Sequence, residues 1–197
     1  MSAVAIIPAR GGSRRIPRKN VRLFHGRPII AYSIEAALGS HMFDDVVVST
    51  DDRQIALVAF DCGAKVSYRD EKLCADDIGP LEVTAFTVKG LKPFEFACCI
   101  YATAPLMTAL DIQRGFCTLI EMKAHYAISI YGADDQPITD AAQFIWATRR
   151  ALINNEPLAG SRTALVPIAP NRVCDINTEE DWQRAERMYL ELNKAAA

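Results

Sequence analysis

A glycine-containing, strongly basic segment near the N-terminus has the composition of a phosphate-binding loop. It spans residues 8–20, follows the apolar stretch 4–7, and holds two adjacent glycines and five cations: Gly11, Gly12, Arg10, Arg14, Arg15, Arg18 and Lys19. Glycines let the backbone turn sharply and gather its N–H groups, while arginine and lysine bind phosphate oxygens. The segment lacks both Gly-Lys-Ser/Thr and G-x-G-x-x-G, which excludes Walker A and dinucleotide-binding loops. A solvated basic loop is the alternative, but the preceding buried strand favours phosphate binding.

Charge is concentrated at the same end of the chain. Residues 1–34 contain seven of the 22 basic residues and no acidic residue, so the remainder carries 15 basic and 24 acidic side chains. Although the net charge is only −2, this distribution attracts anions to the N-terminal loop. We do not expect nucleic acid as the partner, because no aromatic stacking surface interleaves with the basic loop.

Composition indicates one soluble domain. The chain has 197 residues, of which 50% are hydrophobic and 23% charged, and no apolar run approaches the ~18–20 residues that span a bilayer. Its N-terminus lacks the pattern of a signal peptide, so we expect a cytoplasmic protein that does not bind membranes. The six cysteines include no C-x-x-C pair and no histidine cluster, which favours buried small hydrophobes over disulfides or a zinc site.

Short apolar runs alternate with amphipathic stretches along the chain. They predict strands at 4–7, 46–50, 64–67, 97–101, 126–130 and 164–168, and helices at 28–38, 53–62, 81–91, 110–123 and 178–192. Asp51-Asp52 and Thr108 are the expected caps of the second and fourth helices. Residues 131–163 give no clear pattern apart from the apolar segment 143–146. The alternation predicts a three-layer α/β fold around a mainly parallel sheet, with ligands beyond the carboxyl ends of its strands.

Several segments carry recognisable motifs: residues 7–13, 16–20, 28–34, 48–52 and 175–182. Together they resemble the acylneuraminate cytidylyltransferase family over nearly the whole chain. Within that family the segment 98–105, Cys-Cys-Ile-Tyr-Ala-Thr-Ala-Pro, is most similar to the pseudaminic acid branch. The resemblance implies a single cytidylyltransferase domain over 1–197, with a Rossmann-like nucleotidyltransferase fold and a mixed, mainly parallel sheet.

The resemblance also implies a reaction and a set of site residues. CTP and a nine-carbon acidic sugar would give the CMP-sugar and pyrophosphate, for surface glycan or flagellin glycosylation, and such a step is mostly positioning and charge neutralisation. Arg10 and Lys19 match catalytic positions that hold the triphosphate. The implied nucleotide contacts are Ala9, Arg10, Gly11, Gly12, Ser13, Lys19, Asn20, Arg69, Ala75 and Asp77, the last two within the stretch 75–77 that closes over the base. The implied sugar contacts are Tyr101, Thr103, Gln143 and Phe144; for Tyr101, a ring packed on the core is the alternative.

Asp175 matches a catalytic magnesium ligand of the family. Hard oxygen ligands hold Mg²⁺ while the ion neutralises phosphate charge. The family usually places a second aspartate two residues later, where this chain has Asn177, which brings an oxygen without a charge. The alternative is that Asp175 and Asn177 cap the final helix at Thr178.

The segment 131–163 is expected to be a shortened insert on the sugar side. Family members have some tens of residues before the motif that matches 140–146, and in them this part forms an arm for homodimer contacts that also reaches over the partner's sugar site. Here only residues 131–139 intervene. The leading interpretation is therefore a pseudaminic acid cytidylyltransferase that uses CTP and Mg²⁺. Either it makes do with a minimal arm or residues of the arm are absent from this sequence, so both a homodimer and an assembly without the arm contacts stay open. The alternatives are the same reaction on legionaminic or sialic acid, or a nucleotide-binding pseudo-enzyme.

Overall fold

A seven-stranded sheet forms the centre of the molecule. The computed structural model describes residues 1–75, 77–132, 137–160 and 162–195. Its main sheet has the order β5-β4-β1-β6-β8-β7-β9, with β8 antiparallel to both neighbours and every other adjacent pair parallel. The strands are β1 Ala3–Pro8, β4 Asp45–Thr50, β5 Lys65–Tyr68, β6 Phe96–Ile100, β7 Tyr126–Tyr131, β8 Thr139–Thr148 and β9 Thr163–Pro167. The predicted mixed, mainly parallel sheet is confirmed.

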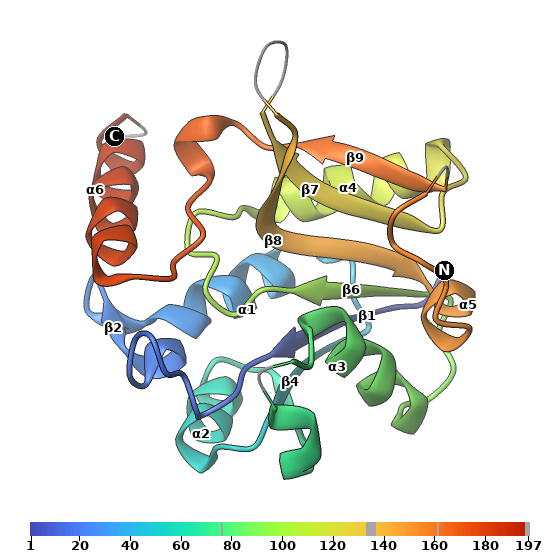
Figure 1. Ribbon diagram of the computed structural model, residues 1–197, viewed down its shortest axis with the longest axis horizontal. Coiled ribbons are helices and arrows are strands. Elements are labelled where there is room, and N and C mark those ends of the chain that lie inside the picture. Colours follow the sequence, from blue (N-terminus) through green and yellow to red (C-terminus); the bar gives the residue numbers. More distant parts are fainter. Residues whose placement is uncertain (76, 133–136, 161, 196–197) are drawn as a thin grey trace.

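Helices cover both faces of this sheet, as the three-layer prediction requires (Figure 1). One face packs on α1 Ile29–Gly39, α2 Arg53–Asp61 and α4 Ala109–Glu121, and the other on α3 Pro80–Thr87 and α5 Arg149–Ile153. The predicted caps are confirmed: Asp52 accepts from two amides at the start of α2, and Thr108 forms a capping box with Asp111 in α4. None of the described helices is long and apolar enough to cross a membrane.

The strand β1 shows why the first apolar run is continuous. Val4 and Ile6 point into the core beneath α3, whereas Ala5 and Ile7 point into the core beneath α1. A strand that is buried on both faces needs apolar residues at every position, unlike a strand with one solvated face. The loop that follows β1 therefore leaves a rigid central strand.

A third, smaller core joins the two ends of the chain. Phe24 lies in the short hairpin of β2 Leu23–Phe24 and β3 Arg27–Pro28, and its ring makes edge contacts with Tyr32, Trp182 and Tyr189. Trp182 and Tyr189 belong to α6 Glu179–Ala195, which lies beside β2 in Figure 1. Ile16 and Ile176 are buried in the same core. The basic loop and the segment before α6 are thereby fixed to each other.

The described part of residues 131–163 belongs to the body of the fold. In it, β8 occupies the sheet position between β6 and β7, and α5 packs on the second core. Of β8, the sequence predicts only the central apolar segment 143–146, because the strand is irregular at its start. Ala142 has a left-handed φ of 51°, and the β7–β8 register shifts between Ile128 and Ile130. The short 3₁₀ helices η1 Lys19–Val21, η2 Glu71–Cys74, η3 Val88–Gly90 and η4 Pro170–Arg172 complete the described elements.

Candidate nucleotide-binding site

The basic loop surrounds a pocket of about 360 Å³ beyond the carboxyl end of β1. Six residues line it, all from the predicted loop: Arg10, Ser13, Arg14, Arg15, Lys19 and Asn20. The Asn20 side-chain amide donates to the backbone oxygen of Arg10 over 2.9 Å, which closes the loop on itself. Four cations around one concave space, with hydroxyl and amide groups between them, have the composition that binds several phosphate groups.

The other three cations of residues 1–34 are held by carboxylates away from this pocket. Arg18 contacts Asp52 over 2.5 Å, Arg22 forms two 2.6 Å hydrogen bonds with Glu179, and Arg27 pairs with Glu35. The Asp52 carboxyl has a lowered pKa because of the hydrogen bond from Arg18. The seven cations that the sequence groups together thus divide into four pocket residues and three bracing residues, which pair with the carboxylates of Asp52, Glu179 and Glu35.

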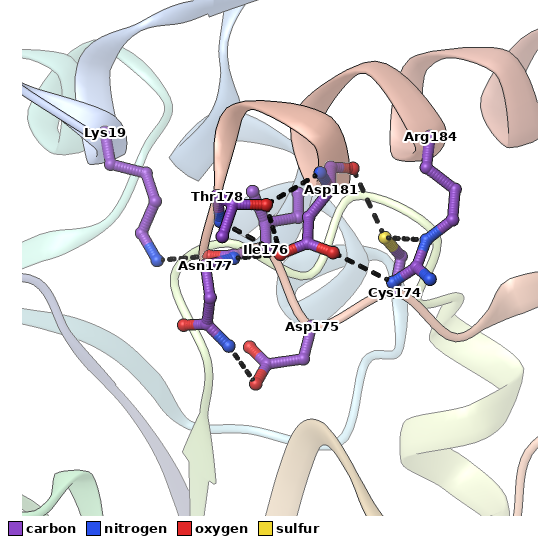
Figure 2. Close-up of polar contacts among 8 residues, drawn as sticks. All are labelled: Lys19, Cys174, Asp175, Ile176, Asn177, Thr178, Asp181 and Arg184. Atoms are coloured by element: carbon purple, nitrogen blue, oxygen red, sulfur yellow. Dashed lines mark hydrogen bonds and ion pairs between the residues drawn. The ribbon is translucent and has the colours of Figure 1, made fainter. Parts of the chain in front are cut away.

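Lys19 links the basic loop to the segment that carries the predicted metal ligands. Its ammonium donates to the backbone oxygen of Ile176 over 2.7 Å, between Asp175 and Asn177 in the chain (Figure 2). Burial lowers the pKa of Lys19, and the charge of Asp175 partly opposes that effect. An ammonium has three donors, so Lys19 has further donors for a phosphate while it holds the Ile176 carbonyl.

Gly11 is needed because its backbone packs closely against Asp52, and its N–H is not available to a ligand. A Cβ at this position would lie 2.7 Å from a carboxylate oxygen of Asp52. The Gly11 N–H already donates to Asp51 over 2.9 Å, so it does not join a free cluster of amides as the sequence suggested. A Cβ on Gly12 would meet no heavy atom within 4 Å, and Ala9 is buried beneath the loop.

The predicted base-contacting residues lie beside the phosphate pocket. Arg10 reaches the backbone oxygen of Cys74 over 3.0 Å, which joins the basic loop to the turn that contains Ala75. Arg69 follows β5, and its N–H donates to the oxygen of Thr50 at the end of β4. The Arg69 Nε atom is buried and has no hydrogen-bond partner in the described part of the chain. Asp76 lies outside the described residues, and Asp77 follows it as an exposed residue.

Tyr101 directly follows the central strand β6 and faces an acidic residue that sequence reasoning did not single out. Its ring packs against both main cores, and its hydroxyl donates to Asp140 over 3.4 Å, while Thr103 is half-buried in the turn beyond it. Burial raises the pKa of Tyr101, and the Asp140 charge adds to this effect. The pKa of Asp140 is raised by burial, with a further contribution from Asp175. Asp140 opens the motif at 140–146, which was the one available signal for it.

Gln143 and Phe144 occupy different environments, although both were predicted to contact the sugar. Phe144 is 0% exposed in the core beneath α4, where its ring lies so close to Gly115 that a Cβ there would meet it at 2.5 Å. This location gives Phe144 no surface for a sugar, and the expectation is corrected accordingly. Gln143 is 3% exposed; its amide donates to the Arg172 oxygen over 2.6 Å, and its Oε1 is buried without a partner among the described residues.

Asp175 and Asn177 lie together on either side of the Ile176 carbonyl that Lys19 holds, and they do not cap the last helix. The Asn177 amide donates to Asp175 over 2.5 Å (Figure 2). Thr178 and Asp181 form the cap instead: Asp181 accepts from the Thr178 N–H over 2.9 Å, and Thr178 Oγ1 accepts from the Asp181 N–H over 3.2 Å. These hydrogen bonds keep the pKa of Asp181 below its ordinary value, against the opposing effect of its burial.

This donor set fits Mg²⁺ when phosphate oxygens complete the coordination. Asp175 offers a carboxylate, Asn177 offers an amide oxygen, and both are hard ligands. The described residues contain no cluster of three histidine, cysteine or acidic side chains that could enclose a metal. Mg²⁺ is usually bound through one or two carboxylates together with substrate phosphates. The pair therefore suits a metal that arrives with a nucleotide.

Known proteins resemble this chain in sequence and in fold. The family model of the cytidylyltransferases matches residues 4–151. A pseudaminic acid cytidylyltransferase of Campylobacter jejuni is 32% identical over 224 residues, covering 96% of this chain and 97% of the relative. A CMP-N,N'-diacetyllegionaminic acid synthase of Legionella pneumophila is 29% identical over 234 residues, covering 100% and 99%. Both alignments are longer than this chain of 197 residues, so these relatives contain segments that it lacks.

A solved structure supports the fold assignment. The structure of a CMP:2-keto-3-deoxy-manno-octonic acid synthetase complexed with CTP superposes with a TM-score of 0.80, although only 15% of residues are identical, and covers 98% of this chain and 100% of that one. A nucleotidyl transferase from Methanothermobacter superposes with a TM-score of 0.73, at 15% identity, and covers 97% and 99%. Since the family match spans most of the chain and the Campylobacter identity nearly all of it, the protein belongs to the cytidylyltransferase family and is a CTP-dependent nucleotidyltransferase, as its motifs predicted.

Proposed function

We propose that this protein transfers CMP from CTP to pseudaminic acid, a nine-carbon acidic sugar, and releases pyrophosphate, for surface glycan or flagellin glycosylation. The observation that carries the proposal is the four-cation pocket of the basic loop, which Lys19 joins directly to the Asp175–Asn177 segment. The identity to pseudaminic acid cytidylyltransferases over nearly the whole chain supports the choice of sugar.

The chemistry divides between the two sides of the site. The anomeric hydroxyl of the sugar gives up its proton to solvent as its oxygen forms a bond to the α-phosphorus, and the bond from that phosphorus to the pyrophosphate oxygen breaks in line. Arg10 and Lys19 hold the triphosphate and stabilise the charge that builds on pyrophosphate. Asp175 and Asn177 would hold Mg²⁺, which supplies neutralisation of phosphate charge. Because this is mainly positioning and electrostatics, the loop needs no nucleophile of its own.

Two of the three buried side-chain polar atoms that have no partner among the described residues provide contacts for the substrates. The Arg69 Nε–H is a donor beside the phosphate pocket, and we assign it to the cytosine ring carbonyl. The Gln143 Oε1 is an acceptor on the Tyr101 side, and we assign it to a hydroxyl or acylamino N–H of the sugar. Buried polar groups that a wrong substrate leaves unpaired provide strong discrimination. Ala75, Asp77 and Thr103 remain proposed contacts at the edges of the site.

A panel assay tests the proposal. Purified protein is incubated with CTP, Mg²⁺ and, separately, pseudaminic, legionaminic and sialic acids, and pyrophosphate release is measured. We expect the highest kcat/KM with pseudaminic acid. A higher value with legionaminic acid would favour the alternative that the Legionella relative suggests. Binding of CTP without turnover on any sugar would instead support a nucleotide-binding role and overturn the proposed reaction.

A further inference from the structure

A buried carboxylate at the start of α4 has no place in the chemistry described above. Asp111 is the third residue of the helix and is 1% exposed. Its carboxylate caps the helix by accepting from the Thr108 N–H over 2.9 Å. A helix cap needs no burial, however, and a carboxylate taken out of water is destabilising unless charged and hydrogen-bonded partners compensate.

The compensating partner is Arg172, 61 residues away in the sequence. Its guanidinium binds both carboxylate oxygens of Asp111, through Nη2 over 2.8 Å and through Nη1, and its side chain is only 20% exposed. Burial of Asp111 favours its neutral form, but the hydrogen bonds from Arg172 and Thr108 outweigh this and lower its pKa. The two-pronged geometry fixes the orientation of Arg172 as well as its position.

The anchor on the α4 side is rigid. Ile112, next to Asp111, is fully buried, and its backbone oxygen accepts from the indole of Trp146 over 2.9 Å. Trp146 lies in β8 and is itself fully buried. The ion pair therefore ties the η4 turn, which ends at Arg172, to the centre of the sheet.

Arg172 is also linked to the proposed metal ligand Asp175, through the chain, and to the proposed sugar contact Gln143, through a hydrogen bond. Asp175 follows it by three residues, and Lys19 anchors the chain again at Ile176, so the exposed Asp175 lies between two fixed points. The backbone oxygen of Arg172 accepts from the Gln143 amide over 2.6 Å. This hydrogen bond uses the Gln143 Nε2 atom as donor, which leaves Gln143 Oε1 as the acceptor for the proposed contact with the sugar.

We propose that the Asp111–Arg172 ion pair is a positioning device that places both Asp175 and Gln143 for the reaction. Neither residue of the pair touches substrate in this scheme; both act through the backbone of residues 172–175. The inference rests on the proposed function, because Asp175 and Gln143 take their roles from it. Removal of residues that support metal ligands typically weakens metal binding about 10- to 100-fold. We use this range for the expected change in Mg²⁺ requirement.

The test compares variants that break the pair with variants that keep its charge. Arg172→Met alone leaves a buried carboxylate, which threatens folding, so the principal variant is the double change Asp111→Asn with Arg172→Met. Arg172→Lys keeps the positive charge but removes the two-pronged guanidinium contact. The matched control is Glu156→Gln, which removes the charge of another partly buried carboxylate. Glu156 pairs with His125, which precedes β7 and so lies at the amino ends of the parallel strands, whereas the basic loop lies at the carboxyl end of β1.

Two readouts separate positioning from general destabilisation. Without metal or nucleotide, amide hydrogen exchange over residues 171–177 should accelerate at least about tenfold in the double variant, and less in Arg172→Lys, while β1 exchanges as in the wild type. With CTP and sugar, the Mg²⁺ concentration for half-maximal turnover should rise about 10- to 100-fold. Exchange and Mg²⁺ requirement no different from those of Glu156→Gln would overturn the proposal. A wild-type protein that transfers no CMP would refute the proposed function alone, since the exchange measurement does not depend on it.

Discussion

Replacement of Lys19 by methionine tests the link between the phosphate pocket and the Asp175 segment. The change removes the ammonium that lines the pocket and donates to the Ile176 oxygen over 2.7 Å, while keeping most of the side-chain volume. A hydrogen bond to a charged group contributes about 1.5–3 kcal/mol, and each 1.36 kcal/mol corresponds to about tenfold in rate. We therefore expect kcat/KM for CTP to fall about 10- to 150-fold. Since Lys19 also stabilises the charge that builds on pyrophosphate in the transition state, kcat should fall as well.

The stability change should be small by comparison. Loss of the Ile176 hydrogen bond destabilises the fold, whereas burial already lowers the pKa of Lys19, so removal of its charge relieves an unfavourable desolvation. These effects have opposite signs, and we expect the free energy of unfolding to change by roughly 1 kcal/mol. Denaturant unfolding monitored alongside steady-state kinetics distinguishes a lost contact from a lost fold.

Arg27→Gln is the matched control for this experiment. It removes one positive charge from the same N-terminal segment, but Arg27 pairs with Glu35 and does not line the pocket. We expect its kcat/KM to stay within about twofold of wild type, since exposed ion pairs contribute little. If Lys19→Met and Arg27→Gln reduce kcat/KM equally, the effect is one of overall charge, and the division of cations between pocket and bracing roles is wrong.

Five further variants test other parts of the site and core. Asp175→Ala should abolish Mg²⁺-dependent turnover without unfolding the chain, and Asn177→Asp should lower the Mg²⁺ concentration needed, both measured by metal titration. Arg69→Ala should weaken the preference for CTP over UTP, measured as the ratio of kcat/KM values; comparable wild-type turnover of both nucleotides would contradict the base assignment. Gly115→Ala should destabilise the fold by about 1–3 kcal/mol through overpacking against two aromatic rings of β8, less up to about 1 kcal/mol of gained helix propensity, as unfolding experiments would show. Because the folded-state pKa of Asp111 is lowered, its stabilising effect is complete above about pH 4 and disappears as pH falls through the folded value, so Asp111→Asn should flatten the acid limb of the stability curve.

Periodicity predicts most of the elements because a doubly covered sheet imposes a simple pattern. Buried strands such as β1, β4 and β6 appear in the sequence as apolar runs, and helices such as α2 and α4 show an apolar face. The first half of β8 does not show this apolar pattern. Asp140 and Gln143 are polar, and the left-handed Ala142 interrupts the alternation, so only the stretch that crosses the core resembles a strand.

The sequence predicts which charged residues gather near the site, but not which residues they pair with. The sequence groups seven cations, yet the carboxylate that holds Arg22 is Glu179, 157 residues away. Local spacing contains no information on such a contact. The same applies to Gln143 and Phe144: successive residues of a strand point to opposite faces, so only the register of β8 shows which of them faces the site. The sequence marks Asp111 only as the third residue of a capping box with Thr108, and Arg172 carries no motif, so their pairing becomes noticeable only when their burial and contact are known.

The C-terminal segment completes the site, although the family match ends at residue 151. Phe24, beside the basic loop, packs against Trp182, and Arg22 both pairs with Glu179 and stacks over the Trp182 ring. Lys19 adds the bond to Ile176. The cations of the basic loop repel one another, so the loop needs attachments to the rest of the fold. The last helix provides an aromatic core and the Arg22–Glu179 ion pair, and the segment before it adds the Ile176 carbonyl that Lys19 holds.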